Sequence, residues 1–179
     1  MSKLGKKPIQ LPKDTKVKVE SGKLILTGPK GSKELTINDK IFSTEISKDN
    51  NLVLKLIKKN EQSSMLWGTT RSILHSAIIG VSTGHEKILE LTGVGFRASL
   101  KDNLLNLQLG FSHDTSYEIP KEVKVSIEKS TVIKIQGIDK ELVGKVAAEI
   151  KMLKPVEPYK GKGIKERGQY VLRKEGKKK

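Results

Sequence analysis

Apolar and polar residues alternate along several short stretches of the chain. This alternation, with its many β-branched residues, is typical of strands joined by turns. Three such stretches recur 108 positions later, each time in the same order. They are residues 9–13, 17–19 and 23–28 in the first copy, and residues 117–121, 125–127 and 131–137 in the second. The pattern predicts two further strands in the first half, around residues 33–37 and 52–57.

A second periodicity, with apolar residues at steps of three and four, predicts one helix in each half of the chain. The predicted buried positions are Leu66, Thr70, Ile73, Leu74, Ala77, Ile78 and Val81 in the first helix, and Leu142, Val143, Val146, Ala147, Ile150 and Leu153 in the second. Gly84 ends the first pattern, whereas Asp139 is placed to cap the second helix and Pro155 to stop it. We therefore expect an α+β fold of two similar domains from an internal duplication, each a mostly antiparallel sheet covered by one long helix.

A hairpin pattern lies between the two copies, with a turn at Asp102 and Asn103. The domain boundary is therefore predicted just before it, near Gly84. The first α+β repeat would span residues 1–82 and the second residues 83–179, with a basic extension from about residue 154.

The hairpin contains Gly93, Gly95 and Ala98, which match the dinucleotide-binding spacing G-x-G-x-x-A. A dinucleotide site needs a helix that opens at the third small residue, so that its amides face the pyrophosphate. The chain here continues into a turn and another strand instead. The glycines are better interpreted as a bulge or bend within a sheet, and no cofactor is expected.

The sequence offers little for catalysis or metal binding. Cysteine is absent, which excludes disulfides, cysteine nucleophiles and thiolate metal sites. The histidines His75, His85 and His113 are isolated from one another, so neither a metal site nor an enzyme is expected. No apolar run reaches the roughly 18 residues that span a bilayer, and the first residues lack the apolar segment of a secretory signal. We expect no membrane or small-molecule partner.

Charge is concentrated at the C-terminus. The chain has a formal net charge of +15, and residues 154–179 hold ten Lys or Arg against three Glu. Glycines at 161, 163 and 168 favour an extended, bent backbone that can approach phosphates closely. The alternative is a disordered, solvated terminus. Apolar residues within the stretch favour an ordered, polyanion-binding extension; they are Ile164, Tyr170, Val171 and Leu172.

The small number of aromatic residues indicates which kind of polyanion the chain binds. Seven are scattered along the chain, whereas unspecific binding of single strands uses several stacking platforms. Folded RNA, contacted through its shape and phosphates, is favoured. Tyr159 could stack on RNA or pack against its own domain. The basic residues at the start of the chain could bind RNA or be solvated; they are Lys3, Lys6, Lys7 and Lys13.

Several motifs together resemble the bacterial-type L-six family of large-subunit ribosomal proteins. The most specific is Val156-Glu157-Pro158-Tyr159-Lys160-Gly161-Lys162-Gly163-Ile164, which is similar to the family's C-terminal signature. Residues 66–71 with Gly80 and Val81 resemble its first helix, residues 91–98 its central hairpin, and residues 137–140 the start of its second helix.

This resemblance implies a structural, non-catalytic role on large-subunit ribosomal RNA, near the factor-binding region, the stalk base and the sarcin-ricin loop, beside neighbouring large-subunit proteins. The implied location is the ribosome of a bacterial cytoplasm or a mitochondrial matrix. The implied RNA-binding residues are Tyr159, Lys160, Gly161, Lys162, Gly163 and Lys165, followed by Arg173, Lys174, Lys177 and Lys178. The alternative function is a non-ribosomal protein that binds structured RNA or an anionic surface.

The chain departs from the family pattern at Ser76, Val156, Glu166 and Gln169. Glu166 bears most directly on function because it places a negative charge beside the expected phosphate contacts. We expect it to pair with Arg167 or to face a lysine-bearing neighbour protein.

Overall fold

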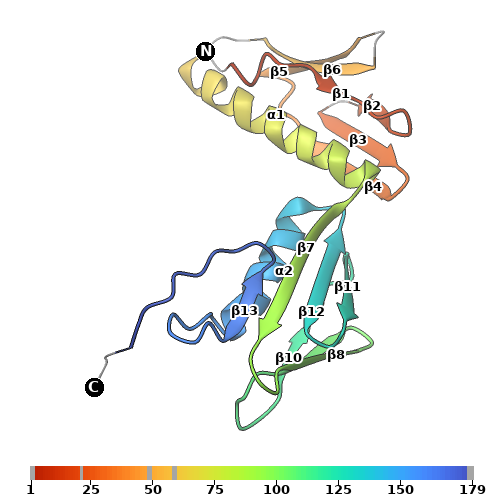
Figure 1. The fold of residues 1–179 in the computed structure, drawn as a ribbon. Coiled ribbons are helices and arrows are strands. Elements are labelled where there is room, and N and C mark those ends of the chain that lie inside the picture. The colour runs from red at the N-terminus through yellow and green to blue at the C-terminus, as the bar shows by residue number, and fades with distance from the viewer. Residues whose placement is uncertain (1–2, 21, 48–49, 58–59, 177–179) are drawn as a thin grey trace. The chain divides into compact units, whose positions relative to one another are not determined.

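The computed structural model describes residues 3–20, 22–47, 50–57 and 60–176, and the chain divides into two compact units, Met1–Gly84 and His85–Lys179 (Figure 1). The first unit contains β1 (Ile9–Gln10), β2 (Lys16–Glu20), β3 (Lys23–Gly28), β4 (Gly31–Thr36), β5 (Phe42–Ile46), β6 (Asn51–Leu56) and α1 (Glu61–Ser82). The second contains β7 (His85–Thr92), β8 (Arg97–Lys101), β9 (Leu104–Gln108), β10 (Thr115–Glu118), β11 (Val123–Glu128), β12 (Val132–Gly137), α2 (Lys140–Leu153) and β13 (Gly163–Glu166). The predicted α+β class is confirmed.

The strands of each unit form two antiparallel sheets rather than one. Their orders are β1-β6-β5 and β2-β3-β4 in the first unit, and β11-β12-β7-β13 and β10-β9-β8 in the second. If β1 is matched with β7, β2 with β8, and so on to β12, the two units have the same sheet orders apart from the extra edge strand β13. The shared topology is what an internal duplication would produce.

The spacing of this duplication differs from the one predicted from sequence. The 108-residue spacing matches β2 and β3 with β11 and β12. The next elements then differ, because a strand, β4, follows β3 whereas a helix, α2, follows β12. The match that holds for all six strands and the helix is shorter: β3 begins at residue 23 and β9 at residue 104, an offset of 81 residues. The longer match arises because the two halves of each unit contain short strands with the same alternation.

Helix α1 begins earlier than its apolar pattern predicts. Its N-terminus is set by a cap, in which the amide of Asn60 donates to the Ser63 hydroxyl at 2.8 Å. Its buried side includes Trp67, whose indole N–H donates to the carbonyl of Leu54 at 2.9 Å. Leu66 and Ile73, predicted to be buried, are exposed instead, because the buried stripe runs beside them through Leu74, Ala77, Ile78 and Val81.

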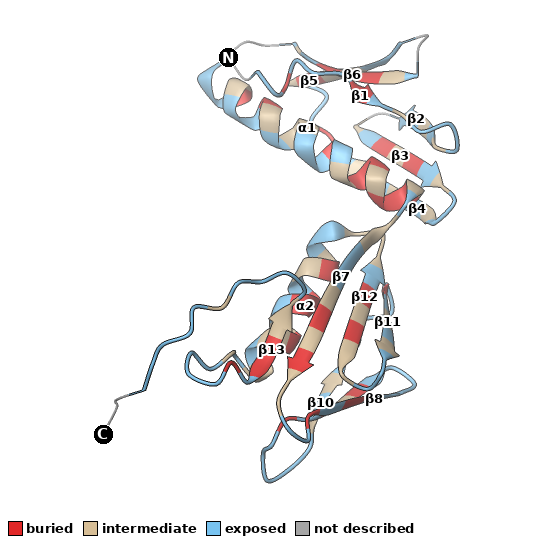
Figure 2. Ribbon diagram, in the orientation of Figure 1, coloured by how far each residue is buried: buried red, intermediate tan, exposed pale blue. Residues whose placement is uncertain are grey.

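Helix α2 begins and ends where the sequence predicts. The Asp139 side chain accepts a hydrogen bond from the amide of Glu141 at 3.0 Å, and the helix stops two residues before Pro155. The helix packs on β7, β12 and β13. Its buried residues join those of both sheets in one apolar cluster, and Figure 2 shows the buried bands crossing β7, β12 and β13.

Two strands, β5 and β13, were not predicted as strands. The glycine motif also differs from the prediction: Gly93 and Gly95 form a turn between β7 and β8, which belong to different sheets, rather than a bulge within one sheet. Gly95 has a φ of 79°, and a side chain at Gly93 would collide with the Phe96 ring. Strand β8 rather than a helix follows this turn, as predicted.

Candidate nucleic-acid interface

Strand β13 anchors the basic extension to the second unit. It pairs antiparallel with β7, and Ile164 lies opposite Leu91. The side chain of Ile164 is fully buried, and its amide donates to the carbonyl of Lys154 at 2.9 Å. One apolar side chain in the middle of a basic stretch therefore fixes that stretch to the core.

The loop between α2 and β13 is closed by its own backbone. The amide of Glu157 donates to the carbonyl of Lys162 at 2.8 Å, and the amide of Gly161 donates to the carbonyl of Glu157 at 3.1 Å. Gly161 has a φ of 70°, a conformation that favours glycine. Lys160 and Lys162 flank this glycine and are exposed. The loop therefore presents two lysines on a hydrogen-bonded turn.

Gly163 lets this loop pack against the end of α2. Its φ is 144°, and an added Cβ would lie 2.7 Å from both the carbonyl oxygen of Pro155 and the Cα of Val156. These neighbours are backbone atoms, which cannot move away as a flexible side chain can. The close approach therefore requires glycine at this position.

The C-terminal tail, residues 167–176, returns to the same loop. The amide of Lys174 donates to the carbonyl of Pro158 at 2.9 Å. The guanidinium of Arg173 lies over Gly161, 3.3 Å from the position that a Cβ there would occupy. The structure thus brings the predicted residues of the tail beside those of the loop, although ten residues of sequence separate them.

The predicted site residues differ in exposure. Those that are exposed are Tyr159, Lys160, Lys162, Arg173 and Lys174. Gly161 and Gly163 are buried within the loop, and Lys165 is half-buried. Lys177 and Lys178 lie outside the described residues. Among the residues that the structure describes, no ion pair is found for the four exposed cations of this set.

Glu166 does not face these cations. Its carboxylate lies 2.6 Å from the ammonium of Lys87 on β7 and 3.1 Å from that of Lys151 on α2. The hydrogen bond from Lys87, followed by that from Lys151, holds the pKa of the Glu166 carboxyl below its usual value. The expected pairing with Arg167 is wrong: Arg167 follows the end of β13, and its side chain lies with that of Lys165 at Glu90 rather than with that of Glu166.

Arg167 pairs with Glu90 instead, at 3.2 Å, and Lys165 approaches the same carboxylate at 3.4 Å. The hydrogen bond from Arg167 is the main reason that the pKa of Glu90 is lowered, and Lys165 adds to it against the opposing effect of burial. Lys87, Lys151 and Glu90 were not predicted to be near the extension. Glu90 and Arg167 are 77 residues apart in sequence, and no local pattern connects them.

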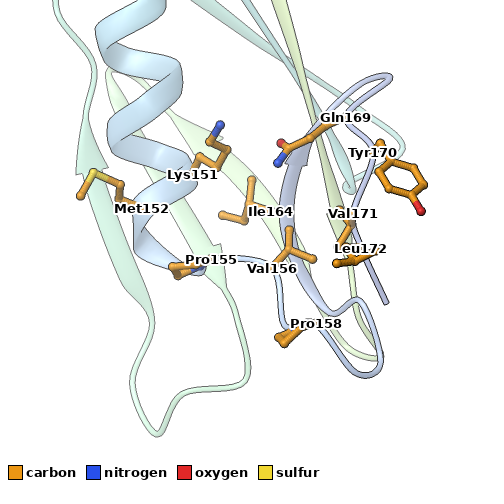
Figure 3. A pocket seen from close by; sticks show the side chains of 10 residues that line it. All are labelled: Lys151, Met152, Pro155, Val156, Pro158, Ile164, Gln169, Tyr170, Val171 and Leu172. Atoms are coloured by element: carbon orange, nitrogen blue, oxygen red, sulfur yellow. The ribbon is translucent and has the colours of Figure 1, made fainter. Parts of the chain in front are cut away.

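Beside the tail lies an apolar groove of about 400 Å³, drawn in Figure 3. Ile164 and Val156 lie between α2 on one side and Val171 and Leu172 on the other. The predicted apolar anchors of the tail behave differently from one another: Ile164 is buried and Val171 half-buried, but Tyr170 and Leu172 are exposed. The order of the tail therefore comes from β13 and backbone hydrogen bonds more than from its own apolar residues.

The other residues and patterns considered in the sequence do not form a second site within the described residues. The exposed side chains include His75 on α1 and all four basic residues near the start, Lys3, Lys6, Lys7 and Lys13. Within the described ranges, no three potential metal ligands come together. No helix of the described residues is long and apolar enough to cross a membrane.

Comparison with known proteins identifies related sequences. Residues 92–167 match the sequence family described as Ribosomal protein L6. The chain is 42% identical over 179 residues to "Large ribosomal subunit protein uL6" of Novosphingobium aromaticivorans, with both chains covered completely. It is 44% identical over 177 residues to the protein of the same name from Wolinella succinogenes, covering 99% of this chain and 98% of that protein. Identity at this level extends over both units.

Proposed function

The chain belongs to the ribosomal protein L6 family, and we propose that it binds large-subunit ribosomal RNA through the loop and tail of its second unit. In this role it is a structural constituent of the large ribosomal subunit that supports subunit assembly and translation. Catalysis is no part of this role. From the resemblance to the family we propose that this contact lies near the stalk base and the sarcin-ricin loop.

The observation that carries this proposal is the pre-formed surface of the loop and tail. Lys160, Lys162, Arg173 and Lys174 come from two segments that are joined by the hydrogen bond from the amide of Lys174 to the carbonyl of Pro158, and their charges are exposed. Because the backbone that carries these cations is already ordered, binding costs less conformational entropy than it would for a disordered segment. The cations supply the salt-dependent part of RNA affinity.

Neighbouring groups increase the selectivity of this surface for folded RNA. Gly161 and Gly163 let the loop close on itself and pack against the end of α2, and the loop has a fixed shape because Gly161 and Glu157 are hydrogen-bonded within it. A rigid arrangement of cations matches one arrangement of phosphates better than others. We therefore expect discrimination among folded RNAs rather than uniform binding to any anionic surface.

The test is a binding measurement with the full chain. The protein should bind large-subunit ribosomal RNA more tightly than small-subunit ribosomal RNA at the same salt concentration, and it should sediment with large subunits through a salt wash. Equal affinity for both RNAs, together with release in the wash, would instead indicate a general polyanion binder and contradict the proposal.

A further inference from the structure

A second, smaller pocket lies on the tail beside the apolar groove, and we call it the cationic pocket because Lys165 and Arg173 line it. Its volume is about 190 Å³, and its lining includes Thr92, Gly161, Lys165, Gln169, Tyr170 and Arg173. Residues 169–171 also line the apolar groove. This short segment therefore borders both the cationic pocket and the groove.

The hydrogen-bond donors of the cationic pocket suit an oxyanion. Arg173 and Lys165 supply positive charge, and the Thr92 hydroxyl and Gln169 amide supply neutral donors. A guanidinium offers paired N–H donors that match phosphate oxygens, and that of Arg173 is positioned by its contact with Gly161. Lys165 also contacts the carboxylate of Glu90, which Arg167 shares, so Arg173 is the more available of the two cations.

The aromatic ring at this pocket is unusually exposed. Tyr170 keeps 83% of its surface accessible. Figure 3 shows its ring pointing away from Val156 and Ile164, so it does not fill the apolar groove. Unpaired bases of RNA stack on exposed aromatic rings, and each stacked base contributes substantially to affinity.

From this arrangement we propose that the cationic pocket binds one phosphate of an unpaired nucleotide of large-subunit ribosomal RNA, whose base stacks on Tyr170. The inference rests on the proposed function and makes it more specific. A base that is paired within a helix keeps its faces stacked on its neighbours, whereas a nucleotide in a loop or bulge can present one to the ring. The tail thus adds recognition of a single unpaired nucleotide to the phosphate contacts of the loop.

The two contacts can be distinguished by the salt dependence of binding. Replacing Tyr170 by alanine removes stacking but no charge. Affinity for a transcript of the large-subunit ribosomal RNA should then fall about tenfold or more, with an unchanged slope of log affinity against log salt concentration. Tyr170→Phe keeps the ring and should bind like the wild type. Arg173→Gln should reduce the slope by roughly one unit.

Leu172→Ala is the matched control, because Leu172 is an exposed residue of the same tail that lines only the apolar groove. It should leave RNA affinity unchanged. Base-specific chemical probing should also show one unpaired base that the wild type protects and Tyr170→Ala does not, while protection of the RNA backbone at the loop persists.

Two results would overturn the inference while the proposed function stands. One is a Tyr170→Ala variant with wild-type affinity for the transcript. The other is a loss in Leu172→Ala as large as that in Tyr170→Ala, which would place the contact in the apolar groove. A wild-type chain without preference for large-subunit RNA would instead overturn the proposed function, and the inference with it.

Discussion

Two pairs of lysines in the second unit have the same charge but different surroundings. Lys160 and Lys162 lie on the loop before β13, exposed and without an ion pair among the described residues. Lys87 and Lys151 come from β7 and α2, and both contact the carboxylate of Glu166. The first pair is available to a polyanion, whereas the second is largely occupied within the protein.

The difference teaches that the charge of a segment does not measure its capacity to bind. Residues 163–166 belong to the same basic stretch as the loop, yet this strand is joined to the core by Ile164 and to two lysines by Glu166. The stretch therefore has two parts. Its loop offers charges to a partner, and its strand holds the loop in place.

The largest effect is expected from removing the anchor of that strand. Ile164→Ala should lower the free energy of unfolding of the second unit by about 2–5 kcal/mol, because a fully buried side chain is truncated in the core. Urea denaturation measures this loss. Val94→Ala, at a position that is 92% exposed, should change stability by less than about 0.5 kcal/mol. Similar losses in both variants would show that β13 is not an anchor.

A somewhat smaller effect is expected at the glycine that joins loop and strand. Gly163→Ala should destabilise the second unit by about 1–3 kcal/mol, since the new Cβ meets backbone atoms and the φ is unfavourable for alanine. Thermal unfolding provides the measurement. Gly144→Ala is the control: a Cβ there meets no atom within 4 Å, and alanine favours the interior of α2. If Gly163→Ala were as stable as Gly144→Ala, the tight packing of the loop would be refuted.

The smallest effect is expected in the dependence of stability on acidic pH. The pKa of Glu166 is lower in the folded protein than in the unfolded chain, so the contribution of this carboxylate to stability is complete above the unfolded value, near 4.5, and is lost as the pH falls through the folded value. Its partners are partly exposed, so the contribution should stay below about 1 kcal/mol.

Thermal midpoints measured from pH 7 downward should therefore fall less steeply for Glu166→Gln than for the wild type. Glu175→Gln removes an exposed carboxylate of the tail and should follow the wild-type curve. A Glu166→Gln curve parallel to the wild type would mean that its bridge to Lys87 and Lys151 contributes nothing in solution.

Much of the fold could be predicted from local patterns. The capped start of α2 at Asp139 and the turn at Asp102 depend on neighbouring residues, which a sequence displays directly. The 108-residue spacing was not the true spacing of the repeat, because strands with similar alternation occur in both halves of each unit. Burial of Trp67 in place of Leu66 depends on which side of α1 meets the sheets, and that side is decided by tertiary packing.

The candidate site shows the same limit. The glycines and lysines of residues 160–163 can be recognised from the sequence because they are adjacent. The return of Arg173 to Gly161 and the bridge from Glu166 to Lys87, 79 positions away, cannot, because neither contact follows from a local periodic pattern. Ion pairs between distant residues leave no periodic pattern, so their effect on available charge requires the structure.

The most direct test compares the two lysine pairs in RNA binding. The double variants Lys160→Ala with Lys162→Ala, and Lys87→Ala with Lys151→Ala, lose the same charge. We expect the first to reduce the slope of log affinity against log salt concentration by roughly one unit for each lysine. The second should keep the wild-type slope. Equal reductions in the two double variants would contradict the account, because binding would then follow total charge rather than the exposed loop.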